Sequence, residues 1–189
     1  MQRAAFLDRD GVINVDHGYV HSADAFEWVP GVLEAAKSLA DAGFLLVIVT
    51  NQSGIGRGYY TADEFEALTD WMKAAFARAG APLAGVYFCP HHPEKALPEF
   101  RFDCDCRKPK PGMLLRAARD LDIDLAESFM FGDKPGDCTA GRSAGCRERI
   151  LLGTNGTAVP DISLAPDATH TAKSLAEAVR MPWFREILK

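Results

Sequence analysis

The stretch Ala4-Ala5-Phe6-Leu7-Asp8-Arg9-Asp10-Gly11 joins a short apolar run directly to an acidic cluster. Continuous apolar runs of this length are typical of strands buried on both faces of a parallel sheet. In open α/β sheets, ligands bind beyond the carboxyl ends of the strands, where Asp8 and Asp10 fall. This stretch therefore predicts both a class of fold and the position of a site.

The same pattern repeats along the chain. Further strands are expected at Leu45–Val49, Val86–Phe88, Phe129–Phe131 and Arg149–Leu152. Helices are expected where apolar residues lie three and four positions apart, at Val32–Ala42, Ala62–Ala79 and Met113–Leu121. This alternation predicts one doubly wound α/β domain over residues 1–189, a Rossmann-like, mainly parallel sheet with helices on both faces.

The C-terminal part of the chain carries different signals. The stretch Thr154–Asp167 is rich in Gly, Pro and Asp and is expected to form loops. Ser174, with Glu177 three residues later, predicts the capping box of a closing helix.

Composition limits the classes of partner. The chain has 189 residues, 48% of them hydrophobic, which is enough for one core but not for two typical domains. A net charge of −5 offers no basic excess for nucleic acid or for an anionic membrane. The longest apolar run, Phe44–Val49, is far too short to span a membrane, and the N-terminus lacks the features of a secretory signal. A cytoplasmic monomer that acts on a small molecule is expected.

The acidic cluster suits metal-assisted chemistry. Residues two apart in an extended segment point to one side, so the carboxylates of Asp8 and Asp10 repel each other unless a cation or a shared proton separates them. Magnesium with oxygen ligands meets that need. One carboxylate could then attack phosphorus while the other handles protons. The alternative is an ordinary acidic turn that ends at Gly11.

Three more motifs follow predicted strands or precede a predicted helix. Thr50-Asn51-Gln52-Ser53-Gly54 offers a hydroxyl, amides and flexible backbone N–H groups for a phosphoryl group. Arg107-Lys108 precedes a helix, whose N-terminal dipole assists anion binding. Gly132-Asp133-Lys134 adds a third carboxylate, and Asp137 either joins it or caps the next helix. Each motif alone also suits a polar loop, but together they favour a phosphoryl-transfer site.

The set Asp8-x-Asp10, Thr50, Lys108 and Gly132-Asp133 resembles the haloacid dehalogenase superfamily of phosphotransferases. The resemblance implies that Asp8 attacks phosphorus to form an aspartyl-phosphate. It implies that Asp10 protonates the leaving oxygen and then deprotonates the hydrolytic water. Thr50 and Lys108 would hold the phosphoryl oxygens. Magnesium would be bound by Asp8, the backbone carbonyl of Asp10, and Asp133.

A cluster of cysteines and histidines predicts a second metal. Cys89-Pro90-His91-His92 is followed by Cys104-Asp105-Cys106, and three thiols with one imidazole suit a closed tetrahedral zinc site. The two imidazoles compete for one position, and spacing does not choose between them. Buried free thiols are the alternative. A structural zinc would order this Pro-containing loop and deliver the adjacent Arg107-Lys108 pair to the site.

The short intervals between the motifs leave no room for a separate cap domain, so loops are expected to shape an open site. The candidates are Asp16-His17-Gly18-Tyr19 and the Gly54–Gly58 loop. Arg57, between two glycines, could clamp a second phosphate, although it also suits an exposed loop arginine.

The motifs C-P-H-H and C-D-C-R-K-P-x-P-G-M resemble the histidinol-phosphatase-related group within this superfamily, from Ala4 to about Leu152. The resemblance selects His91, with Cys89, Cys104 and Cys106, as the zinc ligands. It implies substrate contacts at Asp16, His17, Gly18, Tyr19, Thr50, Asn51, Gln52, Ser53, Arg107, Lys108 and Lys134. Pro135-Gly136 departs from the helix-compatible residues usual there, which leaves the role of Asp137 open.

The resemblance implies a magnesium-dependent phosphatase that removes the 7-phosphate of a heptose 1,7-bisphosphate. Such an enzyme would serve ADP- or GDP-heptose synthesis for bacterial lipopolysaccharide core. Histidinol phosphate is the alternative substrate within the group, but Arg57 and Arg107 favour a substrate with a second phosphate. An inactive, zinc-stabilised binding module is the alternative from another class. It would require the loss of a chemical residue, and none is missing.

Overall fold

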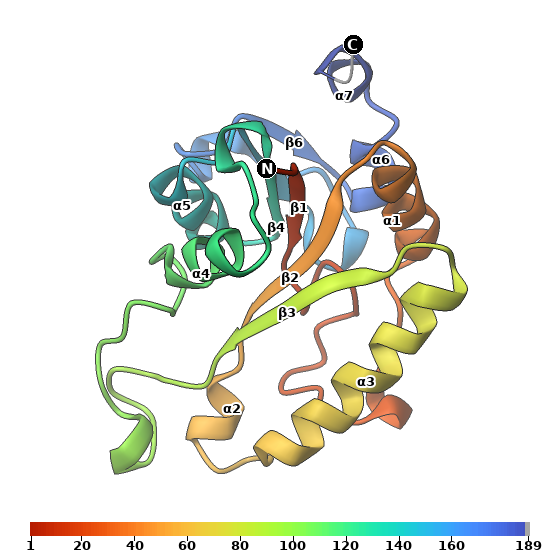
Figure 1. Cartoon of the computed structure of the whole chain (residues 1–189). Coiled ribbons are helices and arrows are strands. Elements are labelled where there is room, and N and C mark those ends of the chain that lie inside the picture. Colours follow the sequence, from red (N-terminus) through yellow and green to blue (C-terminus); the bar gives the residue numbers. More distant parts are fainter. Residues whose placement is uncertain (188–189) are drawn as a thin grey trace.

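A computed structural model describes residues 1–187 as a six-stranded parallel sheet between two layers of helices (Figure 1). The strands are β1 (Ala4–Leu7), β2 (Leu45–Asn51), β3 (Leu83–Cys89), β4 (Phe129–Gly132), β5 (Glu148–Leu152) and β6 (His170–Ala172). Their order in the sheet is β3-β2-β1-β4-β5-β6, and every neighbouring pair is parallel. The chain order reverses between β1 and β4, which is where ligands of such sheets bind. The predicted doubly wound α/β fold is confirmed.

Helices cover both faces of the sheet. They are α1 (Val32–Asp41), α2 (Ser53–Gly56), α3 (Ala62–Arg78), α4 (Gly112–Asp120), α5 (Pro135–Ala144), α6 (Leu175–Ala178) and α7 (Pro182–Ile187). Short 3₁₀ turns lie at Ala23–Ala25, Pro98–Phe100, Leu125–Glu127, Thr154–Gly156 and Ile162–Leu164. Figure 1 shows α4 and α5 on one side of the sheet, with α1, α3 and α6 on the other.

The position of β1 between two hydrophobic cores explains why its sequence is apolar without a break. Ala5 and Leu7 belong to the core that includes residues of α1, α3 and α6. Ala4 and Phe6 belong to the opposite core, with residues of α4 and α5. Since successive side chains of a strand point to opposite faces, a strand covered on both faces needs apolar residues at every position.

Three local features differ from the sequence predictions. Strand β6 was not expected, because His170-Thr171-Ala172 carries no apolar run, yet it pairs with β5. Pro135 is helix-compatible after all, since it opens α5 in the first turn, where a missing N–H costs nothing. Ser174 caps α6 as predicted, but the Glu177 carboxylate accepts from the backbone N–H of Lys173 instead of that of Ser174.

Loops and helices connect the strands within the described residues, without a further domain between them. Among residues 1–187, the structure has no separate cap domain, and the two longest connections are residues 8–31 between β1 and α1 and residues 90–111 between β3 and α4. No helix in the described part of the chain has both the length and the apolar character needed to cross a membrane.

Candidate active site

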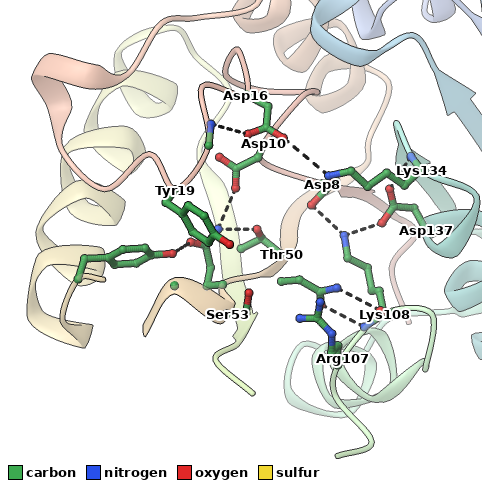
Figure 2. Close-up of a pocket in the computed structure, with 15 residues that line it drawn as sticks. Asp8, Asp10, Asp16, Tyr19, Thr50, Ser53, Arg107, Lys108, Lys134 and Asp137 are labelled. Carbon is green, nitrogen blue, oxygen red and sulfur yellow. Dashed lines mark hydrogen bonds and ion pairs between the residues drawn. The ribbon is translucent and has the colours of Figure 1, made fainter. Parts of the chain in front are cut away.

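Asp8 and Lys108 form the centre of the site. Asp8 directly follows β1, and its backbone N–H donates to the carbonyl of Phe131 on β4 over 3.0 Å. The Lys108 ammonium donates to Asp8 Oδ1 and to the Val49 carbonyl, each at 2.8 Å, and lies 2.7 Å from Asp137 Oδ1. Figure 2 shows the ammonium between the two carboxylates. All three of its protons therefore have acceptors, as a buried lysine requires.

Burial and charge shift the pKa values of this pair. Desolvation raises the pKa of Asp8 to about 7, although the Lys108 ammonium opposes the shift. Burial alone would lower the pKa of Lys108, but the Asp137 and Asp8 carboxylates raise it above its usual range. The lysine is therefore charged at neutral pH. A second cation beside Asp8 would favour the ionised carboxylate that a nucleophile needs.

A cluster of three carboxylates has the chemistry of a magnesium site. Asp8, Asp133 and Asp137 each offer an oxygen within 4.8 Å of the others. Asp133 Oδ2 accepts a hydrogen bond from the Thr154 hydroxyl, but Oδ1 is buried without a partner among the described residues. Burial raises the pKa of Asp133. A buried carboxylate oxygen without a donor is costly unless it meets a cation, so these residues fit a hard divalent ion.

Gly11 leaves room for the Asp133 carboxylate of this cluster. Its φ is +89°, and an added Cβ would lie 2.3 Å from Asp133 Oδ2. A larger residue would therefore be strained and would displace the carboxylate that follows β4.

The carboxylate of Asp10 lies outside this cluster. Its Oδ1 accepts from Arg9 Nη2 at 2.8 Å and from Asn14 Nδ2 at 3.1 Å. Its Oδ2 accepts from Gln52 Nε2 at 3.0 Å. The side chain is thus not a member of the carboxylate set, and the proton-transfer role that the sequence suggested for it stays a prediction. The magnesium contact through its backbone carbonyl stays a prediction.

Asn51, the last residue of β2, is hydrogen-bonded to the backbone of Lys108. Asn51 Oδ1 accepts from the backbone N–H of Lys108, and Asn51 Nδ2 donates to the backbone carbonyl of Lys108, both at 3.1 Å. Thr50, one residue earlier on β2, is buried and lines the site. These reciprocal bonds hold the backbone of Lys108 against the end of β2, and the side chains of Thr50, Lys108 and Asp8 meet in one pocket (Figure 2).

The side chains surround one pocket of about 310 Å³. It is lined by Asp8, Asp10, Asp16, Gly18, Tyr19, Thr50, Asn51, Gln52, Ser53, Gly54, Tyr60, Arg107, Lys108, Lys134 and Asp137. The sequence did not single out Tyr60 as a site residue, because no motif marks it. It also left the role of Asp137 open, whereas the structure places that carboxylate against Lys108.

Two residues expected to contact substrate do not line this pocket. His17 is exposed, and its Nε2 lies 2.8 Å from Glu27 Oε2. The Arg57 guanidinium lies over the ring of Tyr19, with Cζ 5.8 Å from the ring centroid. Arg107 is therefore the arginine that faces the pocket.

The cysteine and histidine cluster assembles beside this pocket. The sulfur atoms of Cys89, Cys104 and Cys106 lie 3.0–3.4 Å apart, and His91 Nδ1 lies 3.6 Å from Cys89 and 3.4 Å from Cys106. A tetrahedral zinc with Zn–S bonds of about 2.3 Å needs ligand separations only slightly larger. His92 points elsewhere, since its Nδ1 accepts from two backbone N–H groups, the nearer at 2.9 Å. The four donors present fit a structural zinc.

One contact joins this cluster to the pocket. Arg107 Nη1 donates to the backbone carbonyl of His91 over 3.2 Å. Because Arg107 directly follows Cys106 and bonds to the backbone of His91, the cluster places the Arg107 backbone and gives its guanidinium one anchor.

The strand order and the carboxylates beyond β1 and β4 place this protein in the class of HAD-like hydrolases. The family model described as HAD-hydrolase-like matches residues 105–178. The chain superposes on D,D-heptose 1,7-bisphosphate phosphatase from B. bronchiseptica, complexed with magnesium and phosphate, with a TM-score of 0.79. The two are 32% identical, and the match covers 97% of this chain and 99% of the other.

Comparison with curated relatives defines the family of this chain within the HAD-like hydrolases. D-glycero-beta-D-manno-heptose-1,7-bisphosphate 7-phosphatase from Pasteurella multocida is 47% identical, over 96% of this chain and 97% of its own length. The protein of the same name from Yersinia pestis is 49% identical, over 94% and 95%. The chain belongs to the family of D-glycero-beta-D-manno-heptose-1,7-bisphosphate 7-phosphatases.

Proposed function

We propose that this chain is a magnesium-dependent phosphatase that removes the 7-phosphate of D-glycero-beta-D-manno-heptose 1,7-bisphosphate. The observation that carries the proposal is the convergence of Asp8, Asp10, Thr50 and Lys108 on one pocket, which Arg107 also faces. The names of the relatives supply the substrate and its beta anomer. The phosphoryl group that is transferred would lie among Asp8, Asp10, Thr50 and Lys108. The phosphate that stays on the sugar would bind to Arg107.

Hydrolysis takes two steps on these residues. An oxygen of ionised Asp8 attacks phosphorus, and the bond from phosphorus to the sugar oxygen breaks as Asp10 gives that oxygen a proton. Lys108 and Thr50 hold the phosphoryl oxygens. Water then attacks the aspartyl-phosphate while Asp10 takes its proton, and the bond between Asp8 and phosphorus breaks to release phosphate. Asp8, Asp133 and the Asp10 carbonyl would hold magnesium, which would supply positive charge beside the transferring group.

The rest of the pocket orients the sugar. Arg107 is our candidate for binding the 1-phosphate, because Arg57 lies outside the pocket lining. Lys134 Nζ lies 3.8 Å from Asp16 Oδ2, so a partly exposed ammonium and a carboxylate lie close together in the pocket lining. A structural zinc on Cys89, His91, Cys104 and Cys106 would order the loop 90–111 and so hold Arg107 in place.

Phosphate release in the presence of magnesium should be measured from heptose 1,7-bisphosphate, histidinol phosphate and fructose 1,6-bisphosphate side by side. We expect kcat/KM for the heptose to be at least about a hundredfold higher, or roughly 2.7 kcal/mol of transition-state stabilisation. A preference for histidinol phosphate would retain the mechanism and replace the substrate. No release from the heptose would overturn the proposal.

A variant tests the second phosphate separately. Arg107→Ala should lower kcat/KM for the bisphosphate by about 30-fold, since a charge-assisted contact to phosphate is lost. With heptose 7-phosphate, which lacks the 1-phosphate, the loss should be less than about threefold. Equal losses on both substrates would contradict the assigned role of Arg107.

A further inference from the structure

The amide of Gln52 is fully engaged inside the protein. Its side chain is buried, with 2% of the residue exposed. Nε2 donates to Asp10 Oδ2 at 3.0 Å and to Thr50 Oγ1 at 2.8 Å, while Oε1 accepts from the Tyr60 hydroxyl. Both amide protons therefore already have partners, and neither is free to bind a substrate oxygen.

The orientation of this amide is determined by its neighbours. A rotation by 180° would bring Oε1 against Asp10 Oδ2, so that two acceptors would face each other without a proton. It would also turn the Nε2 donor toward the Tyr60 hydroxyl and remove the acceptor that this hydroxyl now meets. The observed orientation is the one that satisfies Asp10, Thr50 and Tyr60 together.

Tyr60 is itself held firmly. Its ring stacks on that of His21, with centroids 5.0 Å apart and 4° between the planes. Gly54 also approaches the ring closely, since an added Cβ would be 2.1 Å from Tyr60 Cε1. Burial raises the pKa of Tyr60 to about 12, so the hydroxyl keeps its proton throughout the neutral range.

We propose that Gln52 is a positioning residue, which holds the carboxylate of Asp10 and the hydroxyl of Thr50 at a fixed separation, and that it is not a contact for the substrate. One amide nitrogen donates to both side chains, so their separation is set before substrate arrives. The inference rests on the proposed function in one respect, since it takes Asp10 as the acid and base of the reaction. It replaces the substrate-binding role that the sequence suggested for Gln52.

The chain offers a matched control, because its only glutamines are Gln2 and Gln52, and Gln2 is exposed. Methionine preserves the length of glutamine and removes both hydrogen-bonding groups. Gln52→Met should lower kcat by at least about tenfold, or 1.4 kcal/mol, with KM for heptose 1,7-bisphosphate within about threefold. Gln2→Met should change neither constant. A rise in KM at unchanged kcat would make Gln52 a substrate contact and overturn the proposal.

A second variant tests the proposal even if Gln52→Met does not fold. Gln52→Glu is nearly isosteric and places a carboxyl group against Asp10. Two adjacent carboxyl groups compete for a proton, so the acidic limb of the pH–kcat profile should move up by at least about half a pH unit. A profile that superposes on that of the wild type would show that Gln52 does not act through Asp10.

A spectroscopic measurement tests the geometry without substrate. Protein labelled with nitrogen-15 in the glutamine side chains should give two pairs of amide proton signals, one pair per glutamine, assigned by the two methionine variants. We expect the Gln52 protons to exchange with solvent at least about tenfold more slowly than those of Gln2. Equal exchange rates would contradict the proposal. If the wild type proves inactive on the heptose, the proposed function fails, and these exchange rates still decide whether Gln52 is bound as described.

Discussion

The Thr154 hydroxyl donates a 2.8 Å hydrogen bond to Oδ2 of Asp133, and Oδ1 of the same carboxylate is left buried and without a partner among the described residues. Thr154 begins the turn after β5, whereas Asp133 follows β4. In the same turn, the backbone N–H of Asn155 donates to the Gly11 carbonyl, and Asn155 Oδ1 accepts from the backbone N–H of Asp16, both at 2.8 Å. A turn in the expected loop region thus connects the ends of three strands.

Thr154→Val should weaken magnesium binding by about tenfold, because the isosteric valine leaves Asp133 free to rotate its unpartnered oxygen away from the ion. Thr154→Ser keeps the hydroxyl and should restore most of the affinity. Calorimetric titration with magnesium measures both. Thr157→Val is the control, since the Thr157 hydroxyl donates only to the Thr154 carbonyl. Unchanged affinity in Thr154→Val would show that this hydrogen bond does not orient the ligand.

Asp8→Asn should reduce phosphate release by more than about a thousandfold, because the amide cannot form the aspartyl-phosphate. Its folding should not suffer. Burial raises the pKa of Asp8 to about 7, so the native carboxylate destabilises the metal-free protein at higher pH. The thermal midpoint without magnesium should equal or exceed that of the wild type above pH 7, as measured by calorimetry. Asp70→Asn, at an exposed position of α3, is the control for both readings.

Magnesium binding should depend on pH through Asp8. The pKa of this group is raised from 3.8 to about 7, so its contribution to stability is fully present at low pH and is lost as the pH rises through 7. Magnesium requires the ionised form, so its apparent affinity should rise with pH up to about 7 and then level off. Titrations between about pH 5.5 and 8.5 measure this. An affinity that falls over that range would contradict the assignment.

Zinc removal should act on substrate binding more than on the chemical step. Cys104→Ser should lower the zinc content from about one per chain, measured by mass spectrometry, and raise KM for the bisphosphate, because Arg107 is tied to the carbonyl of His91. Cys146→Ala changes a buried thiol outside the cluster and should retain the metal. A folded protein that stays fully active with no zinc would exclude the structural role.

The positions of the strands could be predicted from local sequence. Ala4–Leu7 was predicted with the bounds that the structure has, since a strand covered on both faces needs an uninterrupted apolar run. The β3 strand is longer than Val86–Phe88 because it is the edge of the sheet and tolerates partly exposed residues. The β6 strand carries no such run, and its pairing with β5 defines it.

The fold class and the short motifs that meet at the strand ends could be predicted from the sequence, because polar residues that follow buried parallel strands are carried to one edge of the sheet. How these side chains face one another depends on tertiary packing. In the folded protein the Asp10 carboxylate faces Gln52, Lys108 contacts both Asp8 and Asp137, and Arg57 lies outside the pocket lining. Asp8 and Lys108 are 100 positions apart, and such contacts depend on packing that linear spacing does not encode.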